Sequence, residues 1–240
     1  MTNPTALRTL IAFGVFVLVL AGLPGEARSQ AVNPSVKALL AKVRAAYARP
    51  DYLSFRVDYT YANDGAPGQP VDSMYGQVNM DKERALFRIQ GTETLVNSQY
   101  SLQVLPEDKI IYLTKSRARS PMDPVGMLDS ALAHLGGLSI GLDQTGNLSV
   151  LSFRFPPGQA YTEIRMTVDT ATGYLQQITY HLYTAGWVEK DQVSKPGHPA
   201  PYEAEGLVDV HFSHYAHRQF GGNLFDTDHF FTREIGRAHV

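Results

Sequence analysis

The chain has 240 residues, a formal net charge of −2 at pH 7 with both signs interspersed, and no cysteine. The balanced charge excludes the basic surface of a nucleic-acid-binding protein and the polybasic segment that binds anionic lipid. The lack of cysteine excludes disulfides, thiolate metal sites, a cysteine nucleophile and a lipid-modified N-terminal cysteine. A chain of this length can bury a core that folds without cross-links.

The N-terminus has the order of a secretory signal peptide. Arg8 is followed by an apolar run over 10–20 and then by the helix-ending Gly22-Leu-Pro-Gly25. The run matches the ~7–15 residues of a signal peptide and falls short of the ~20 that span a bilayer. Small residues allow cleavage before Gln30 or before Val32, and the sequence leaves both open.

This pattern sets the expected organisation of the chain. We expect residues 1–31 to be removed on export to a bacterial periplasm and residues 32–231 to form a single domain. Residues 232–240 are short and polar, so we expect them to be a poorly ordered tail.

The mature chain opens with a helical pattern. Asn33 and Pro34 supply an N-cap and a proline at the first helical position, and apolar residues recur at helical spacing from Val36 to Tyr47. Pro50 ends the helix, because the residue before a proline is pushed out of the helical conformation.

From 53 to 61 the pattern changes to strict alternation, with apolar or aromatic residues at the odd positions and polar residues at the even ones. A period of two predicts a half-buried strand. Shorter apolar and alternating runs predict four more strands, at 74–80, 85–90, 100–104 and 110–113. The first half of the chain is therefore predicted to be one helix that leads into a β-meander.

Residues 116–146 interrupt this meander with a second helical pattern. Pro121 and Pro124 open the helix, Leu128 and Leu132 share one face, and Gly136-Gly137 stops it. The flanking prolines and glycines make this helix a candidate for a movable lid. Ordinary packing against the sheet is the alternative.

The meander resumes over 148–155, 164–168, 174–183 and 207–216. Several strands have one polar face, which predicts an antiparallel sheet covered on one side only. Two helices can cover a large sheet only if the sheet curls around them. The predicted fold is therefore α+β and mostly β: a strongly curved antiparallel sheet, an incomplete half-barrel, with helices covering its concave face.

An aromatic-rich stripe would face inward in such a fold. It can be ordinary core, or it can be one wall of an apolar ligand cavity. On the second interpretation the predicted ligand-binding residues are Leu53, Phe55, Val57, Tyr59, Phe87, Ile89, Leu128 and Leu132.

The densest group of possible metal ligands is His211, His214 and His217. On a strand, His211 and His217 would share a face but lie about 20 Å apart, and His214 would point the other way. We therefore expect no metal site and no cofactor. The sequence also has no nucleophile elbow or glycine-rich phosphate loop, so no catalytic residue is assigned and no enzyme is expected. Trp187 is either buried or part of a contact surface.

Several segments between about 50 and 231 follow the pattern of one known family. They are Leu53 to Tyr59, Tyr75 to Arg88, Pro106 to Leu113, Ile164 to Asp169 with its turn to Ile178, Val208 to Ser213, and Asn223 to Phe230. In this order they resemble the LolA-like periplasmic carriers of outer-membrane lipoproteins. Each segment is a β-meander pattern with turns, so the resemblance lends more weight to the fold than to the function.

The resemblance implies a half-open barrel with a helical lid that shields lipid acyl chains. Each buried methylene is worth ~0.8 kcal/mol, so an acylated ligand needs a dry enclosure to cross water. In the family an arginine after the second strand helps to hold the lid shut, and the nearest residues here are Lys82 and Arg84. Lysine lacks the planar fork of arginine. These two residues are the lid-locking candidates.

The expected function is that of a periplasmic carrier that shields an apolar ligand, a lipid or the acyl chains of a lipoprotein, in a half-barrel cavity. Its expected partners are the lipid or acylated protein and envelope proteins of the inner and outer membranes, and we expect a monomer. The alternative is a non-catalytic protein–protein interaction module of the envelope on the same fold. A continuous apolar hollow under the 122–136 helix favours carriage, and a filled one favours interaction.

Overall fold

A computed structural model describes residues 33–48, 50–82, 84–106, 109–115, 137–186, 188, 192–195, 200–221, 223–227 and 230. The predicted signal peptide, the candidate lid with Leu128 and Leu132, Trp187 and the polar tail lie outside these residues. Among the described residues, none of the helices is long and apolar enough to span a membrane.

The described fold is mostly β, with one α-helix, α2 (Pro34–Ala48), and a short 3-10 turn, η1 (Thr184–Gly186). Its strands form an 11-stranded sheet in the order β6-β5-β4-β3-β2-β1-β11-β10-β9-β8-β7. The strands are β1 (Tyr52–Asn63), β2 (Pro70–Asp81), β3 (Ala85–Ile89), β4 (Thr92–Val96), β5 (Tyr100–Leu105), β6 (Ile110–Lys115), β7 (Ser139–Thr145), β8 (Leu148–Arg154), β9 (Tyr161–Asp169), β10 (Leu175–Tyr183) and β11 (Glu205–Ala216). Strands β6 and β7 are the two edges of this antiparallel sheet, which is not closed into a barrel.

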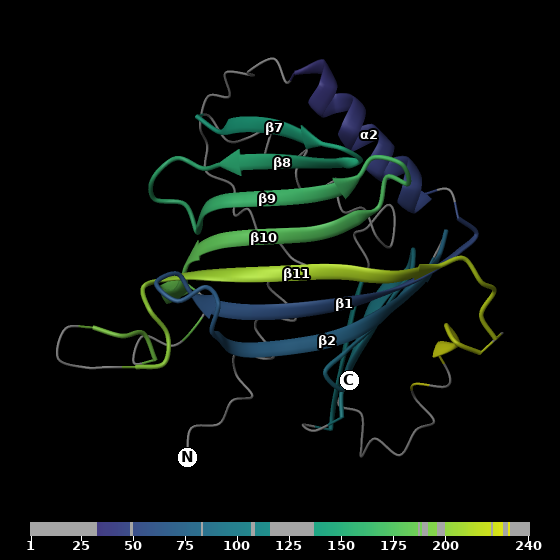
Figure 1. The fold of residues 1–240 in the computed structure, drawn as a ribbon. Helices are drawn as coiled ribbons and strands as arrows, with labels where there is room; N and C mark the ends of the chain where they lie inside the picture. Colours follow the sequence, from purple (N-terminus) through teal and green to yellow (C-terminus); the bar gives the residue numbers. More distant parts are fainter. Residues whose placement is uncertain are drawn as a thin grey trace. The chain divides into compact units, whose positions relative to one another are not determined.

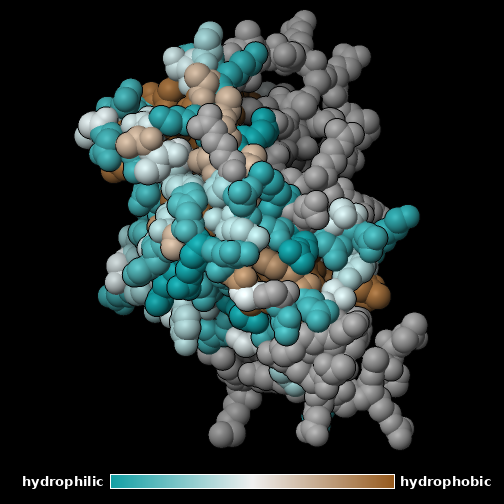
Figure 2. Space-filling view, turned by 90° about the vertical axis from the view of Figure 1, so that its right-hand side faces the viewer, coloured by the Kyte–Doolittle hydropathy of each residue, from teal (hydrophilic) through white to brown (hydrophobic). Residues whose placement is uncertain are grey.

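The chain divides into two compact units. Unit 1 comprises the described parts of 1–44, 58–74 and 124–211, and unit 2 comprises those of 45–57, 75–123 and 212–240. Strands β1, β2 and β11 each contribute residues to both units. Figure 1 shows the neighbouring strands β7 to β10 of unit 1 in sequence order. In the view of Figure 2, hydrophilic residues predominate on the described surface, and hydrophobic ones emerge in small groups.

Unit 1 follows the predicted amphipathic alternation. Ile164 on β9 lies opposite Phe153 on β8 and Tyr180 on β10, and all three side chains are buried on one face. A register shift in β9 near its start places Tyr161 opposite Leu182, so Tyr161 joins this apolar face. The opposite face of the same strands is polar, as one-sided burial requires.

Helix α2 begins where the sequence predicts. The side chain of Asn33 caps it by accepting a hydrogen bond from the Ser35 amide at 2.9 Å. Its apolar residues are buried from Val36 to Tyr47, which confirms the amphipathic pattern. Within unit 1, the Lys42 amine donates a hydrogen bond to the carbonyl of Thr170 and so ties the helix to the turn between β9 and β10.

Unit 2 differs from the prediction of a sheet that is covered on one side only. Ala85, Leu86 and Phe87 are consecutive residues of β3, yet all three are buried. Leu86 belongs to a hydrophobic cluster with Leu95, Leu102, Val104, Phe225 and Phe230. The C-terminal phenylalanine segment therefore covers the second face, and the prediction of one-sided cover is wrong for this unit.

Two strands were not predicted. The pattern placed 116–146 in an interruption of the meander, but residues 139–145 form edge strand β7. Strand β4 was missed as well, and only Leu95 and Val96 among its five residues are apolar. Strand β4 buries only Leu95 and shows no alternation. Strand β7 alternates only at Ile140 and Leu142, which is too short a pattern to predict a strand.

Candidate functional site

The candidate site in unit 2 is one row of side chains that crosses five strands. Direct register pairs join Val78 to Phe87, Phe87 to Thr94, Thr94 to Gln103, and Gln103 to Tyr112. Residues that lie directly opposite in antiparallel strands point to the same face. We call this set the Phe87 row. It lies on the face opposite the C-terminal phenylalanine cluster, since Leu86 and Leu95 on the same strands point the other way.

Gln103 gives this row its chemistry. The residue is 6% exposed, and its buried side-chain oxygen Oε1 has no hydrogen-bond partner among the described residues. An unsatisfied buried acceptor costs about 1–3 kcal/mol, so such groups are rare in native folds and need an explanation. Because Phe87 lies two strands away, about 10 Å, the row combines an aromatic wall with one acceptor for an N–H or O–H donor.

The other predicted wall residues of unit 2 are buried too. Leu53, Phe55 and Val57 on β1 are at most 1% exposed, and Ile89 on β3 is 6% exposed. Burial of this kind is what both core packing and a cavity wall would give. The structure therefore places all these residues in the interior, without distinguishing the two roles.

Phe55 has specific aromatic neighbours. Its ring stacks on Tyr215, with ring centroids 5.1 Å apart, and meets the edge of Tyr47 at 5.9 Å. The hydroxyls of Tyr47 and Tyr215 lie 2.6 Å apart and share a hydrogen bond. Phe55 is thus held in an aromatic cluster that joins α2, β1 and β11 within unit 2.

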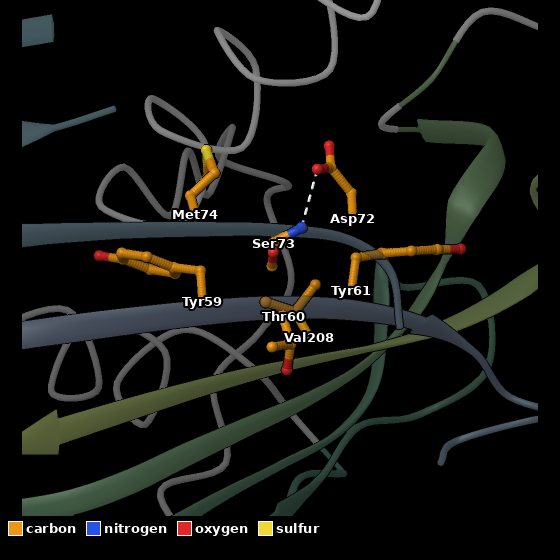
Figure 3. A pocket seen from close by; sticks show the side chains of 7 residues that line it. All are labelled: Tyr59, Thr60, Tyr61, Asp72, Ser73, Met74 and Val208. Carbon is orange, nitrogen blue, oxygen red and sulfur yellow. Dashed lines mark hydrogen bonds between the residues drawn. The ribbon is translucent and has the colours of Figure 1, made fainter. Parts of the chain in front are cut away.

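Tyr59 belongs to unit 1, where it lines a shallow hollow with a cavity volume of about 10 Å³. Figure 3 shows Tyr59 and Tyr61 extending from β1 in opposite directions, with Met74 beside them on β2. Ligand pockets usually have about 300–1,000 Å³. This hollow is therefore too small to enclose an acyl chain by itself.

Among the buried tyrosines of unit 1, Tyr59 is a predicted wall residue, whereas Tyr161 and Tyr180 are not. Burial raises the pKa of Tyr59, Tyr161 and Tyr180, and Tyr180 adds to the effect at Tyr59. The rings of Tyr161 and Tyr180 lie 5.8 Å apart. These hydroxyls remain protonated at physiological pH, so they can only act as neutral hydrogen-bonding groups. Tyr161 was missed because a register shift cannot be read from the sequence.

The two lid-locking candidates have different surroundings. Arg84 donates hydrogen bonds from Nη2 and Nε to Oδ2 of Asp81 at 2.7 and 3.1 Å, and its guanidinium carbon lies 4.7 Å from the ring centre of Phe225. Lys82 forms a 2.6 Å ion pair with Asp51 in which both side chains are largely exposed. Arg84 is thus the candidate in contact with the C-terminal phenylalanine segment. The lid that either residue would hold lies outside the described residues.

The polar face of unit 1 has one buried acid. Glu163 on β9 accepts hydrogen bonds from Nε of Arg154 at 3.1 Å and from Nε of Arg165 at 2.9 Å. Burial raises the pKa of this carboxyl, but the hydrogen bonds and charges of Arg165 and Arg154 outweigh burial, so the pKa is lowered overall. This arrangement keeps Glu163 ionised and cross-links two strands. It leaves the acid without the free proton that a general acid needs.

The histidines do not converge. His211, His214 and His217 are all exposed on β11 or just after it, and His214 has a φ of 55° that interrupts the strand alternation. Across the part of the chain that the structure describes, no three His, Asp or Glu side chains are arranged to hold a metal ion.

Comparison by sequence finds no match to a family model and none among curated proteins. Solved structures are similar. A conserved protein of Thermus thermophilus has a TM-score of 0.48 and 9% identity, covering 80% of this chain and 92% of that one. A LolA superfamily protein of Nitrosomonas europaea has a TM-score of 0.38 and 13% identity, and the match covers 80% of this chain and 98% of that one. A chain of the MucA/MucB complex of Pseudomonas aeruginosa has a TM-score of 0.42 and 14% identity, and the match covers 80% of this chain and 61% of that one. A LolA superfamily protein is thus among the solved structures to which this chain is similar.

Proposed function

We propose that the protein is a non-enzymatic periplasmic carrier that shields an apolar ligand, a lipid or the acyl chains of a lipoprotein, against the Phe87 row. The observation that supports it is the buried, unpartnered Oε1 of Gln103 on a face that also bears Phe87. The unpaired acceptor defines the kind of ligand head that fits, because it needs an N–H or O–H donor.

The composition of the Phe87 row supports this role. Ligand pockets are mostly apolar and carry a few polar groups that fix the orientation of the ligand. A position that served packing alone would be more stable with leucine, since leucine would leave no unsatisfied acceptor. The amide N–H where an acyl chain joins a polypeptide is a donor of the required kind. Phe87 and Ile89 would contact the first methylenes of that chain.

The proposal extends to the candidate lid. Leu128 and Leu132 would cover the chain from the other side, in line with the predicted helices on the concave face. Arg84 is the better of the two candidates to hold the lid, because its guanidinium has a defined orientation between Asp81 and Phe225. Lys82 is engaged only in an exposed ion pair with Asp51.

The test uses two matched probes on the purified protein. N-palmitoylglycine has an amide N–H beside its acyl chain, and methyl palmitate has none. We expect Gln103→Leu to weaken binding of N-palmitoylglycine about tenfold and to leave methyl palmitate unchanged, because only the first probe loses a hydrogen bond. Phe87→Glu should abolish binding of both. Titration calorimetry in the absence of detergent measures each affinity.

Two controls separate binding from folding. Gln144→Leu changes an exposed glutamine on β7 and should leave both affinities unchanged. Gln103→Leu should unfold without ligand at the same or a higher temperature than the wild type, because it removes a buried unsatisfied group. If the wild type binds neither probe, and native mass spectrometry of protein taken from the periplasm shows only the apo mass, the carrier proposal is wrong. The interaction module then becomes the working hypothesis.

A further inference from the structure

Strand β6 is exposed in an unusual way for an edge strand. Seven large hydrophobic side chains are exposed among the described residues, and three of them, Ile110, Tyr112 and Leu113, lie on this six-residue strand. Tyr112 is 51% exposed and Leu113 is 59% exposed. Single apolar residues on a surface need no explanation, but a group on one short strand does.

These side chains occupy both faces of β6. Tyr112 lies opposite Gln103 and points to the face of the Phe87 row, whereas Leu113 lies opposite Leu102 and points to the other face. One backbone edge of β6 pairs with β5, and no other described strand pairs with its outer edge. The strand thus combines open backbone donors and acceptors with apolar side chains above and below them.

The other edge of the sheet lacks this combination. Strand β7 consists of Ser-Ile-Gly-Leu-Asp-Gln-Thr, and neither of its two large apolar residues, Ile140 and Leu142, is among the exposed ones. Each edge strand carries one exposed charged residue, Asp143 on β7 and Lys115 on β6, so the two edges differ in their exposed apolar side chains. An exposed apolar edge is a liability, so its retention at β6 alone points to a use.

We propose that β6 is a docking edge, at which an extended segment of another protein adds a strand to the sheet. Strand addition uses backbone hydrogen bonds for affinity and alternate side chains for specificity. Lys109 and Lys115 stand at the two ends of the strand, and neither forms an ion pair with a described residue. The partner segment that fits is apolar in its middle and has a carboxylate near each end.

Charge argues against a second copy of this chain as the occupant. If two copies of β6 paired in antiparallel fashion about a two-fold axis, Lys109 of one copy would lie near Lys115 of the other at both ends. Like charges directly opposite each other across strands are destabilising. The docking edge therefore favours an acidic partner over self-association. This inference is independent of whether the Phe87 row binds a ligand.

The probes are two capped heptapeptides, Asp-Val-Thr-Val-Thr-Val-Asp and the same sequence with lysine at both ends. We expect the acidic peptide to bind the purified protein at least about tenfold more tightly than the basic one, since two attractive charge pairs replace two repulsive ones. Binding should slow hydrogen exchange of the amides of residues 110–115 and leave those of 139–145 unchanged. A third peptide, acidic but methylated at alternate backbone nitrogens, should not bind.

Charge reversal on the protein provides the matched test. The double variant Lys109→Glu, Lys115→Glu changes two exposed side chains, so its melting temperature should equal that of the wild type. It should reverse the preference and bind the basic peptide about tenfold more tightly than the acidic one. Equal affinity for both peptides, no binding of either, or protection of 110–115 that grows with protein concentration without peptide would each overturn the proposal; the last outcome would identify a second copy as the occupant.

Discussion

The two units of the molecule use their strands in different ways. In unit 1 one face of the strands is apolar, and the other is a polar surface on which Glu163 links Arg154 and Arg165. In unit 2 both faces are apolar, because Phe225 and Phe230 pack on one face while Phe87 lies on the other. Strands with one polar face need packing on their apolar face only. Strands that are apolar on both faces need something packed against each face.

This difference shows where a ligand could bind. In unit 1 the charged side chains of Arg154, Glu163 and Arg165 pair with one another on the polar face. In unit 2 the C-terminal segment occupies one apolar face, and the other bears the unsatisfied oxygen of Gln103. The face that the C-terminal phenylalanines do not occupy is therefore the one proposed for the ligand.

The largest expected effect comes from removing a buried ring in either unit. Phe230→Ala in unit 2 and Phe153→Ala in unit 1 each truncate a side chain that is 1% exposed. We expect each to lower the free energy of unfolding by about 3–5 kcal/mol, through lost burial and the cavity that remains. Native-state hydrogen exchange should show that Phe230→Ala weakens β3 to β5 first and Phe153→Ala weakens β8 to β10 first. If both variants weaken all strands equally, the two units do not unfold separately.

A smaller effect is expected on the polar face of unit 1. Glu163→Gln should lower the free energy of unfolding at pH 7 by about 1 kcal/mol, because the charged hydrogen bonds are lost but both arginines are largely exposed. The folded-state pKa of Glu163 lies below the unfolded value, so its contribution is present above the unfolded pKa and disappears as the pH falls through the folded pKa.

Urea denaturation across this pH range would measure the contribution of Glu163. The wild type and Glu163→Gln should converge in stability at acidic pH, below the ordinary glutamate range. The control Glu205→Gln, at an exposed position on β11, should match the wild type throughout. A constant difference between the wild type and Glu163→Gln at every pH would show that the charge of this residue does not matter.

The smallest effect is expected at Arg84, which contacts the C-terminal phenylalanine segment of unit 2. Arg84→Lys removes the planar group that lies over Phe225, and we expect a loss of about 0.5–1 kcal/mol. Lys82→Arg, two residues away in the exposed pair with Asp51, should produce no measurable change in thermal denaturation. Equal effects of the two substitutions would indicate that Arg84 contributes charge alone, without the contact to Phe225.

The sequence predicts strands β8 to β10 of unit 1 well, although it misses the edge strand β7, because alternation reports one-sided burial directly. The turn at Asp169–Gly173 also follows from local residue chemistry. The Gly173 amide donates a hydrogen bond to the Asp169 carbonyl at 2.7 Å, and Gly173 has a positive φ of 83°, which glycine permits. Helix α2 and strand β1 also lie where the pattern places them, within two residues at each end.

The features that the sequence does not predict depend on strand register and on segments distant in the chain. Gln103, between Leu102 and Val104, looks like a solvent-facing residue of a half-buried strand, and only its pairing with Thr94 places it in the Phe87 row. The two-sided burial of β3 follows from phenylalanines more than a hundred residues later in the chain. Periodicity reports which residues share a side of one strand, and it cannot tell what covers that side.

The position of β11 has a consequence for the way in which the molecule is made. The last strand of the chain lies between β1, the first, and β10, so the middle of the sheet is supplied last. Contacts such as the hydrogen bond from Asn63 to Pro201, 138 residues away, cannot form until most of the chain has been synthesised. Until then β1 and β10 present unpaired edges that can aggregate, and long-range pairing of this kind slows folding. A nascent chain of this topology should therefore depend on a holding chaperone until its final residues emerge.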